Sequence, residues 1–227
     1  MDTPLKVGLM VPANNTTMER ELLAWLPPGS TCRRIGIPRG AGMLTRDTMP
    51  AYRDAALRLA ESFRDDRPDV LAYGCTAAGF ISGPAGDAEL SAALSDLLGC
   101  PVMTTARGMV RALASDGARE IAVVTPYQDG VNRQLEDFLA DGGIRVRRLA
   151  SFRAPDTDAL GRITAEQVRA LAEETMGEDV DALFIGCSQL PTHAVLDGLA
   201  ARFGRPAWSS IKATAWDAMR VTAPVAA

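Results

Sequence analysis

The chain of 227 residues is long enough for one large domain or for two small ones of about 100 residues each. Its formal net charge of −4 and the lack of any basic run argue against a nucleic-acid surface. No apolar stretch approaches the roughly 20 residues of a membrane span, and no signal peptide precedes the first strand-like segment. We therefore expect a cytoplasmic protein that binds neither nucleic acid nor membrane.

Short apolar runs alternate with longer amphipathic stretches along the chain. In chain order they predict a strand at 6–11, a helix at 16–26, a strand at 32–37, a helix at 48–63, a strand at 70–73, a helix at 87–98, a strand at 102–104 and a helix at 107–114. The series continues with a strand at 121–124, a helix at 131–140, strands at 145–149 and 182–185 around a helix at 164–176, a helix at 193–203, a strand at 207–209 and a helix at 212–221. Such alternation is typical of an α/β fold with parallel sheets covered by helices on both faces.

The two halves of the chain resemble each other. Val7 and Pro12 of the first strand region correspond to Ile121 and Pro126, which lie 114 residues later. Cys75 and Cys187 each follow a glycine directly after the third strand of their half, 112 residues apart. We therefore predict two Rossmann-like parallel-sheet halves related by a pseudo-twofold axis, with residues 1–104 and 210–227 in the first domain and 105–209 in the second.

Four segments at carboxyl ends of strands mark the predicted site, because ligands of parallel α/β sheets bind at those ends. They comprise residues 12–17, 74–79, 126–128 and 186–189. If the two halves pack with these ends facing each other, all four segments line one cleft. Cys75 and Cys187 would then lie on opposite sides of a small ligand.

Two facing cysteines suit a reaction without a cofactor. Inversion of a carbon centre needs one group that removes a proton and another that returns one on the opposite face. A thiol whose pKa is lowered by a helix N-terminus can do either, and a thiolate also adds to activated double bonds. Thr76 and Ser188, with the backbone N–H groups beside them, can hold a carboxylate.

Other residues that could bind a metal or a cofactor have simpler explanations. The four cysteines, at 32, 75, 100 and 187, show no paired short spacing, so neither a zinc site nor a disulfide framework is predicted. Nucleotide-binding glycine motifs are missing, residues 39–42 form only a glycine turn, and no lysine lies in a Schiff-base setting. We expect no metal and no organic cofactor. Packing roles are predicted for Cys32, Cys100, Trp25, Trp208 and Trp216, and a surface position for His193.

The segment from Val11 to Glu19 (VPANNTTME) closely resembles the N-terminal motif of maleate cis-trans isomerases, which belong with arylmalonate decarboxylases in the aspartate/glutamate racemase superfamily. Residues 124–127 (VTPY) are similar to the second-domain motif of these enzymes, and the two Gly-Cys pairs match their cysteine positions. The resemblance implies that Asn15 and Tyr127 bind substrate carboxylates. It implies that Cys75 is the nucleophile or one base, and that Cys187 is the acid or the opposite base.

The function predicted first is therefore a cofactor-independent isomerase of a small carboxylic acid, similar to maleate isomerase. An aspartate/glutamate-type racemase of an amino acid or its derivative is the alternative, because maleate isomerases carry an asparagine where Thr157 stands here. An arylmalonate-type decarboxylase is a weaker alternative, since those enzymes have a small residue at the position of Cys75. A non-catalytic carboxylate sensor and a homo-oligomeric assembly are further possibilities.

Overall fold

The computed structural model describes residues 3–39 and 42–223 and contains two four-stranded sheets. The first sheet is built from β1 Lys6–Pro12, β2 Thr31–Ile37, β3 Val70–Tyr73 and β4 Val102–Thr104. The second is built from β5 Glu120–Thr125, β6 Arg145–Ser151, β7 Ala182–Ile185 and β8 Ala207–Ser209.

The helices connect and cover these strands. Those of the first half are α1 Met18–Trp25, α2 Met49–Ala60 with the 3-10 turn η1 Glu61–Phe63, α3 Thr76–Ile81, α4 Gly83–Leu98 and α5 Thr105–Ser115. Those of the second half are α6 Asp129–Asp141, α7 Thr157–Gly161, α8 Ala165–Thr175, α9 His193–Phe203 and α10 Ser210–Thr222. No helix of the described residues has the length and apolar character to cross a bilayer.

The two sheets have the same topology. Their strand orders are β2-β1-β3-β4 and β6-β5-β7-β8, and every neighbouring pair is parallel. Residues 6–11 and 120–124 thus lie in separate sheets, as the internal repeat predicts. The central strands β1, β3, β5 and β7 are almost entirely buried, which explains their unbroken apolar sequences. The predicted α/β fold with two similar halves is confirmed.

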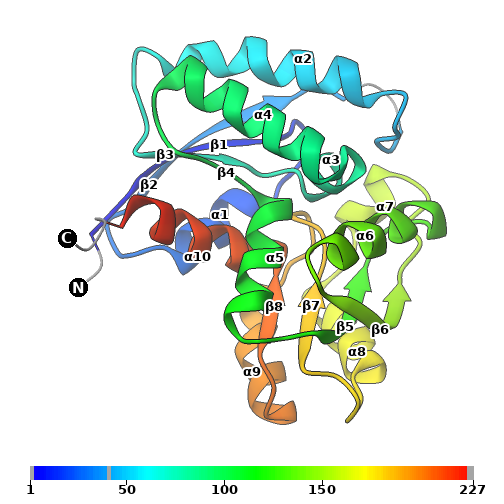
Figure 1. Ribbon diagram of the computed structural model, residues 1–227. Helices are drawn as coiled ribbons and strands as arrows, with labels where there is room; N and C mark the ends of the chain where they lie inside the picture. Colours follow the sequence, from blue (N-terminus) through cyan, green and yellow to red (C-terminus); the bar gives the residue numbers. More distant parts are fainter. Residues whose placement is uncertain (1–2, 40–41, 224–227) are drawn as a thin grey trace.

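Helices cover both faces of the first sheet. Figure 1 shows α2 and α4 together on one face, and α1 with the C-terminal helix α10 on the other. Helix α10 contacts both α1 and α5, and α5 extends from the first sheet toward the second. The domain boundaries at 104/105 and 209/210 stay a prediction, although α10 packs on the first half as the sequence suggested.

One hydrophobic cluster runs through both halves of the molecule. It includes Tyr73 of β3, Val124 of β5, and also Cys75 and Cys187. A second cluster fills the space between the first sheet, α1 and α10. The carboxyl ends of β3 and β7 are therefore buried inside the shared core, and the two halves hold the cysteines between them.

The predicted elements differ from the structure mainly beside the first Gly-Cys pair. The segment 74–79, to which no element was assigned, contains most of helix α3, which begins immediately after Cys75. Helix α4 begins at Gly83 instead of residue 87, with Pro84 in its first turn. The helix predicted at 48–63 ends at Ala60 and continues as η1. The short helix α7 was not predicted; the Asp156 carboxylate caps it by accepting the Ala159 N–H.

Gly79→Ala should lower the free energy of unfolding by about 1–3 kcal/mol, because α3 packs too closely on α5 for a methyl group. A Cβ at position 79 would lie 2.5 Å from the Cβ of Ala106 and 2.9 Å from Oδ1 of Asp87. Gly198→Ala is the matched control, since nothing lies within 4 Å of its Cβ position in α9 and the change should stabilise by about 0.5–1 kcal/mol. Urea unfolding of the two variants measures both effects; equal stabilities would contradict the packing described.

Candidate active site

Cys75 is held at the end of β3 by close packing around the preceding glycine. A Cβ at Gly74 would lie 2.6 Å from Sδ of Met18 and 2.7 Å from Cγ1 of Val11, so a larger residue would separate β3 from α1. Cys75 is the N-cap residue of α3, with φ −106° and ψ 97°, and its side chain is 5% exposed. The thiol thus lies inside the protein at the first turn of a helix.

Cys187 follows β7 in a strained conformation. Its φ of 127° lies in the region that favours glycine, and such strain costs about 1–3 kcal/mol. Two hydrogen bonds hold it: its N–H donates to Oγ of Ser210 (2.9 Å), and its Sγ accepts the N–H of Gln189 (3.5 Å). The surrounding structure therefore fixes the direction of this buried thiol.

A polar bridge joins the two cysteine segments. Ser188 Oγ donates to the carbonyl oxygen of Gly74 (2.7 Å), and Asn15 Nδ2 donates to the carbonyl (3.1 Å) and Oγ (3.2 Å) of Ser188. Asn15 Oδ1 accepts the N–H groups of Thr17 and Met18 at the start of α1. Asn15 and Ser188 therefore bond to each other across the two halves and position the segments that carry the cysteines.

Three buried hydroxyl groups beside the cysteines have no hydrogen-bond partner among the described residues. They belong to Thr76, Tyr127 and Tyr52. The backbone of Tyr127 is fixed, since its carbonyl accepts bonds from Asn132 and Ser151, and its ring packs edge-on against another aromatic ring. Buried polar groups almost always have partners. Unsatisfied donors that converge beside two thiols are therefore well suited to an anionic ligand.

A small cavity connects these groups. All six predicted site residues line it: Cys75, Cys187, Asn15, Thr76, Tyr127 and Ser188. The centre of a water molecule can move through about 50 Å³ of it, several times the roughly 10–15 Å³ that one water requires. The four predicted segments thus meet at one site, as the carboxyl-end rule requires, and the space suits a ligand of a few heavy atoms.

Burial dominates the acidity of both thiols. It raises the pKa of Cys75 to about 11, against the lowering effects of the Ala78 N–H and of Arg39. Burial also raises the pKa of Cys187, opposed by the Gln189 N–H. The lowering that a helix N-terminus can supply does not prevail here, because α3 gives Cys75 one N–H group while the core removes water from both thiols.

The model of the arylmalonate decarboxylase family matches residues 7–226, nearly the whole chain. The chain belongs to this family. It is 27% identical to the maleate isomerase of Nocardia farcinica over 95% of this chain and 89% of that one, and 25% identical to the maleate isomerase of Geobacillus stearothermophilus over 95% and 90%. A solved mutant of the N. farcinica maleate cis-trans isomerase, with a covalently bound succinylcysteine intermediate, matches with a TM-score of 0.87 at 25% identity, over 96% of this chain and 93% of that one.

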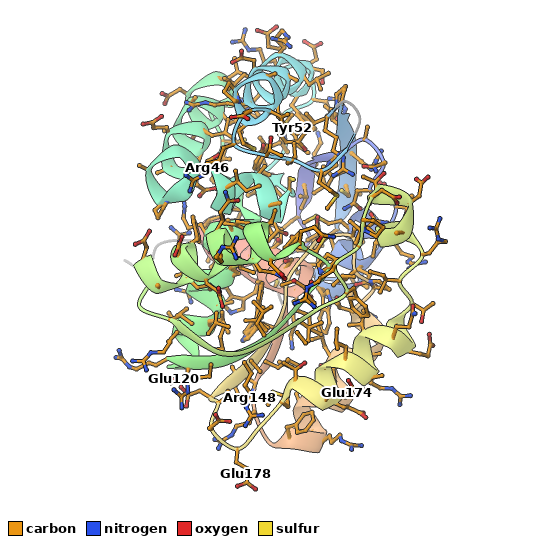
Figure 2. All side chains as sticks on the ribbon, turned by 90° about the vertical axis from the view of Figure 1, so that its right-hand side faces the viewer. Arg46, Tyr52, Glu120, Arg148, Glu174 and Glu178 are labelled. Carbon is orange, nitrogen blue, oxygen red and sulfur yellow. The ribbon has the colours of Figure 1, made fainter. Side chains whose placement is uncertain are left out.

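Several cavity residues of this family member were not identified from the sequence. Arg39 lines the cavity, although residues 39–42 were interpreted only as a glycine turn, of which 40–41 lie outside the described residues. Thr157, which the sequence singled out only as a departure from maleate isomerases, also lines it. Tyr52 of α2 is not part of the lining but is buried beside Cys75, and Figure 2 shows it beneath that helix. The even spacing of apolar residues in α2 gave no signal that one of them carries a functional hydroxyl.

Two supporting residues were also missed. Arg34 of β2 donates through Nη2 to the carbonyl oxygens of Ala13 (2.8 Å) and Asn15 (2.9 Å), and so fixes the loop that presents Asn15. Glu21 of α1 is buried, and its carboxylate accepts hydrogen bonds from the N–H and hydroxyl of Thr192 at 3.0 Å. Both bind backbone groups beside the four cavity segments, a role that sequence spacing does not reveal.

The remaining candidates lie outside the cavity lining. The ring of His193 packs edge-on against Trp25 with a centroid separation of 4.7 Å, so it does not form a pair with either cavity thiol. Trp208 and Trp216 pack against each other at 5.8 Å. The packing roles predicted for these tryptophans are confirmed.

Alkylation of Cys75 by iodoacetamide should rise by about tenfold for each pH unit from pH 7 to beyond pH 9, because only the thiolate reacts. The sign follows from the pKa of about 11: the reactive fraction is small at neutral pH and increases until the pH passes that value. Peptide mass spectrometry after timed exposure measures the rate at this residue. A rate that levels off below pH 8 would show that burial does not control the pKa of the Cys75 thiol.

Proposed function

We propose that this chain is a cofactor-independent cis-trans isomerase of a small unsaturated dicarboxylate, of the maleate isomerase type, with Cys75 as nucleophile and Cys187 as proton donor. The observation that carries this proposal is the placement of both thiols on one small cavity, next to unpartnered buried hydroxyls. Support comes from the N. farcinica relative, whose structure holds a succinylcysteine. A succinyl thioether is what thiolate addition to maleate, followed by protonation, produces.

The first half of the reaction forms a carbon–sulfur bond. The Cys75 thiolate adds to one alkene carbon of the cis substrate, and the π electron pair moves onto the adjacent carbon and its carboxylate as an enediolate. The Cys187 thiol then gives its proton to that carbon. The product is a succinyl thioether on Cys75, with a thiolate at Cys187 and a single bond where the double bond was.

The second half reverses these steps after rotation about that single bond. The Cys187 thiolate removes a proton from the carbon beside the thioether, the electron pair restores the double bond, and the carbon–sulfur bond breaks. The trans product leaves, and both cysteines return to their starting protonation states. No atom is gained or lost, so the cycle needs no oxidant or reductant.

The hydroxyl groups supply the stabilisation that this chemistry needs. Negative charge grows on a substrate carboxylate in the enediolate, and donors already aimed at that position lower the barrier most. Thr76 and Tyr127 are the donors that the cavity leaves unpaired, and Tyr52 contributes beside Cys75. We assign to Asn15 and Ser188 a role in holding the two cysteine segments together, because the amide N–H groups of Asn15 and the hydroxyl of Ser188 already donate within this bridge.

The coupled ionisation of the two thiols also fits their different roles as nucleophile and proton donor. Each thiolate raises the cost of ionising the other, since Cys187 raises the pKa of Cys75 through like-charge repulsion. When one thiol ionises, the other therefore keeps its proton, because loss of the second proton costs more. A nucleophilic thiolate facing a protonated thiol is the state that the addition step uses.

A racemase of an amino-acid derivative is the second candidate, and Thr157 favours it. This side chain lines the cavity where maleate isomerases carry an asparagine, so the donor set for the substrate differs. In that reaction the two cysteines would exchange a proton across a planar carbanion without a covalent adduct. Decarboxylation of an arylmalonate is less well supported, because it does not require Cys75.

Proton NMR in deuterated water separates the candidates. The protein is incubated with maleate, and separately with enantiopure aspartate, glutamate and their N-acyl derivatives. The proposal predicts the appearance of fumarate and no exchange at the α-carbon of the amino acids. Exchange of an α-proton without any fumarate would overturn it in favour of racemisation. A cytoplasmic, reducing location would keep both cysteines as the free thiols that the reaction uses.

A further inference from the structure

The cavity lining contains a cationic side chain in addition to its neutral donors. Arg39 follows β2 directly and lines the cavity together with Met43 and Leu44. The lining contains no other charged side chain among the described residues. None of the ion pairs found within residues 3–39 and 42–223 involves Arg39. Its guanidinium is thus a charge at the site that the protein described here does not neutralise.

The charge of Arg39 is felt at the reacting groups. It favours the thiolate forms of both Cys75 and Cys187, lowering their pKa values against the effect of burial. Met43 and Leu44 place apolar atoms beside it, and a half-buried ion pair in apolar surroundings is stronger than one in water. An anion bound in this part of the cavity would meet a preorganised cation.

A dicarboxylate needs such a partner. The hydroxyls of Thr76 and Tyr127 lie near each other, on the side of the cysteines, and can hold one carboxylate with neutral donors. The amide donors of Asn15 are already directed to Ser188. A second buried carboxylate without a counter-charge would carry a large desolvation cost. Arg39 is the group in the described lining that can offset this cost with a bidentate pair.

We propose that Arg39 binds the second carboxylate of the substrate and selects dicarboxylates over monocarboxylates. This inference rests on the proposed function for the identity of the substrate, but it concerns binding and not the chemical step. The family resemblance suggested Tyr127 as the partner of the second carboxylate. Here that role passes to Arg39, a cationic residue in the segment after β2. Tyr127 then shares the first carboxylate with Thr76.

Isothermal titration calorimetry on the Cys75→Ser background tests this without turnover. Maleate is compared with cis-2-butenoate, which has a methyl group in place of one carboxylate. Arg39→Gln should weaken maleate binding by about 10- to 100-fold and change cis-2-butenoate binding by less than about twofold. Arg39→Lys should recover part of the loss. Arg46→Gln is the matched control: this exposed arginine, labelled in Figure 2, is not part of the cavity lining and should change neither affinity.

The outcomes separate this inference from the isomerase proposal. Maleate binding that is unchanged in Arg39→Gln, or an equal loss for both ligands, would overturn the role of Arg39 even if the unsubstituted protein isomerises maleate. A selective loss of maleate binding would support the role even if no turnover occurs, in which case only the isomerase proposal falls. Failure of maleate to bind the Cys75→Ser protein would also overturn the role of Arg39. Melting temperatures of the variants confirm that each one folds.

Discussion

Replacing Cys75 with alanine should lower kcat for maleate by a factor of about 10⁴ or more, because the covalent route loses its nucleophile. The cavity and its donors would remain, so KM should change little. Cys75→Ser should be nearly as inactive, since a hydroxyl with a pKa far above that of a thiol supplies almost no anion near neutral pH. Continuous NMR or ultraviolet assays of fumarate formation measure the loss.

Cys32→Ala is the matched control for this experiment. Cys32 lies on the edge strand β2, outside the cavity lining, and only a packing role is predicted for it. It should keep full kcat, whereas Cys75→Ala should not. A Cys75→Ala protein that retains more than a small fraction of the rate would remove the nucleophile from the mechanism.

Replacing Cys187 with alanine should lower kcat by a factor of about 10²–10⁴, the range expected for a lost proton donor and acceptor. Addition of Cys75 to the substrate does not need this residue, but completion of the cycle does. The alanine also relieves none of the backbone strain at φ 127°, so the variant keeps the local geometry that Ser210 fixes. Single-turnover kinetics should show that maleate is consumed in an amount equal to the enzyme while fumarate forms only slowly.

The pH dependence of the same variant provides its control. In the unsubstituted protein, activity should rise as Cys75 ionises and fall once Cys187 also loses its proton. The Cys187→Ala variant should lose the alkaline fall and keep the rise, because Cys75 remains and its pKa no longer rises through repulsion by a second thiolate. Two profiles that fall at the same alkaline pH would show that another group donates the proton.

Much of the fold could be predicted because both halves repeat one pattern. The apolar runs of β1, β3, β5 and β7 mark strands buried on both faces, and the Gly-Cys pairs mark matching strand ends. Because the strands of each sheet are parallel and ligands bind at their carboxyl ends, residues from four distant segments are expected at one place. That is why all six predicted site residues line the cavity.

The sequence was less informative where long-range packing decides the result. Arg39 lines the cavity and Tyr52 lies beside Cys75 only through long-range packing, and nothing in their local sequence distinguishes them from packing or surface residues. The short helix α3 forms around Gly79, a poor helix former, because it packs on α5. The raised pKa of Cys75 has the same origin, since burial in a core shared by two halves outweighs the effect of a helix terminus.

The covalent step at Cys75 is the central claim, and mass spectrometry of the Cys187→Ala protein tests it most directly. The protein is incubated with maleate, quenched in acid, measured intact and then digested to locate the modified residue. The account predicts one added mass of maleic acid for each chain, carried as a succinyl thioether on Cys75, with water supplying the proton that Cys187 would otherwise give. The adduct should be absent from Cys75→Ala/Cys187→Ala. An unmodified Cys187→Ala protein that still converts maleate to fumarate at the full rate would contradict the two-cysteine mechanism.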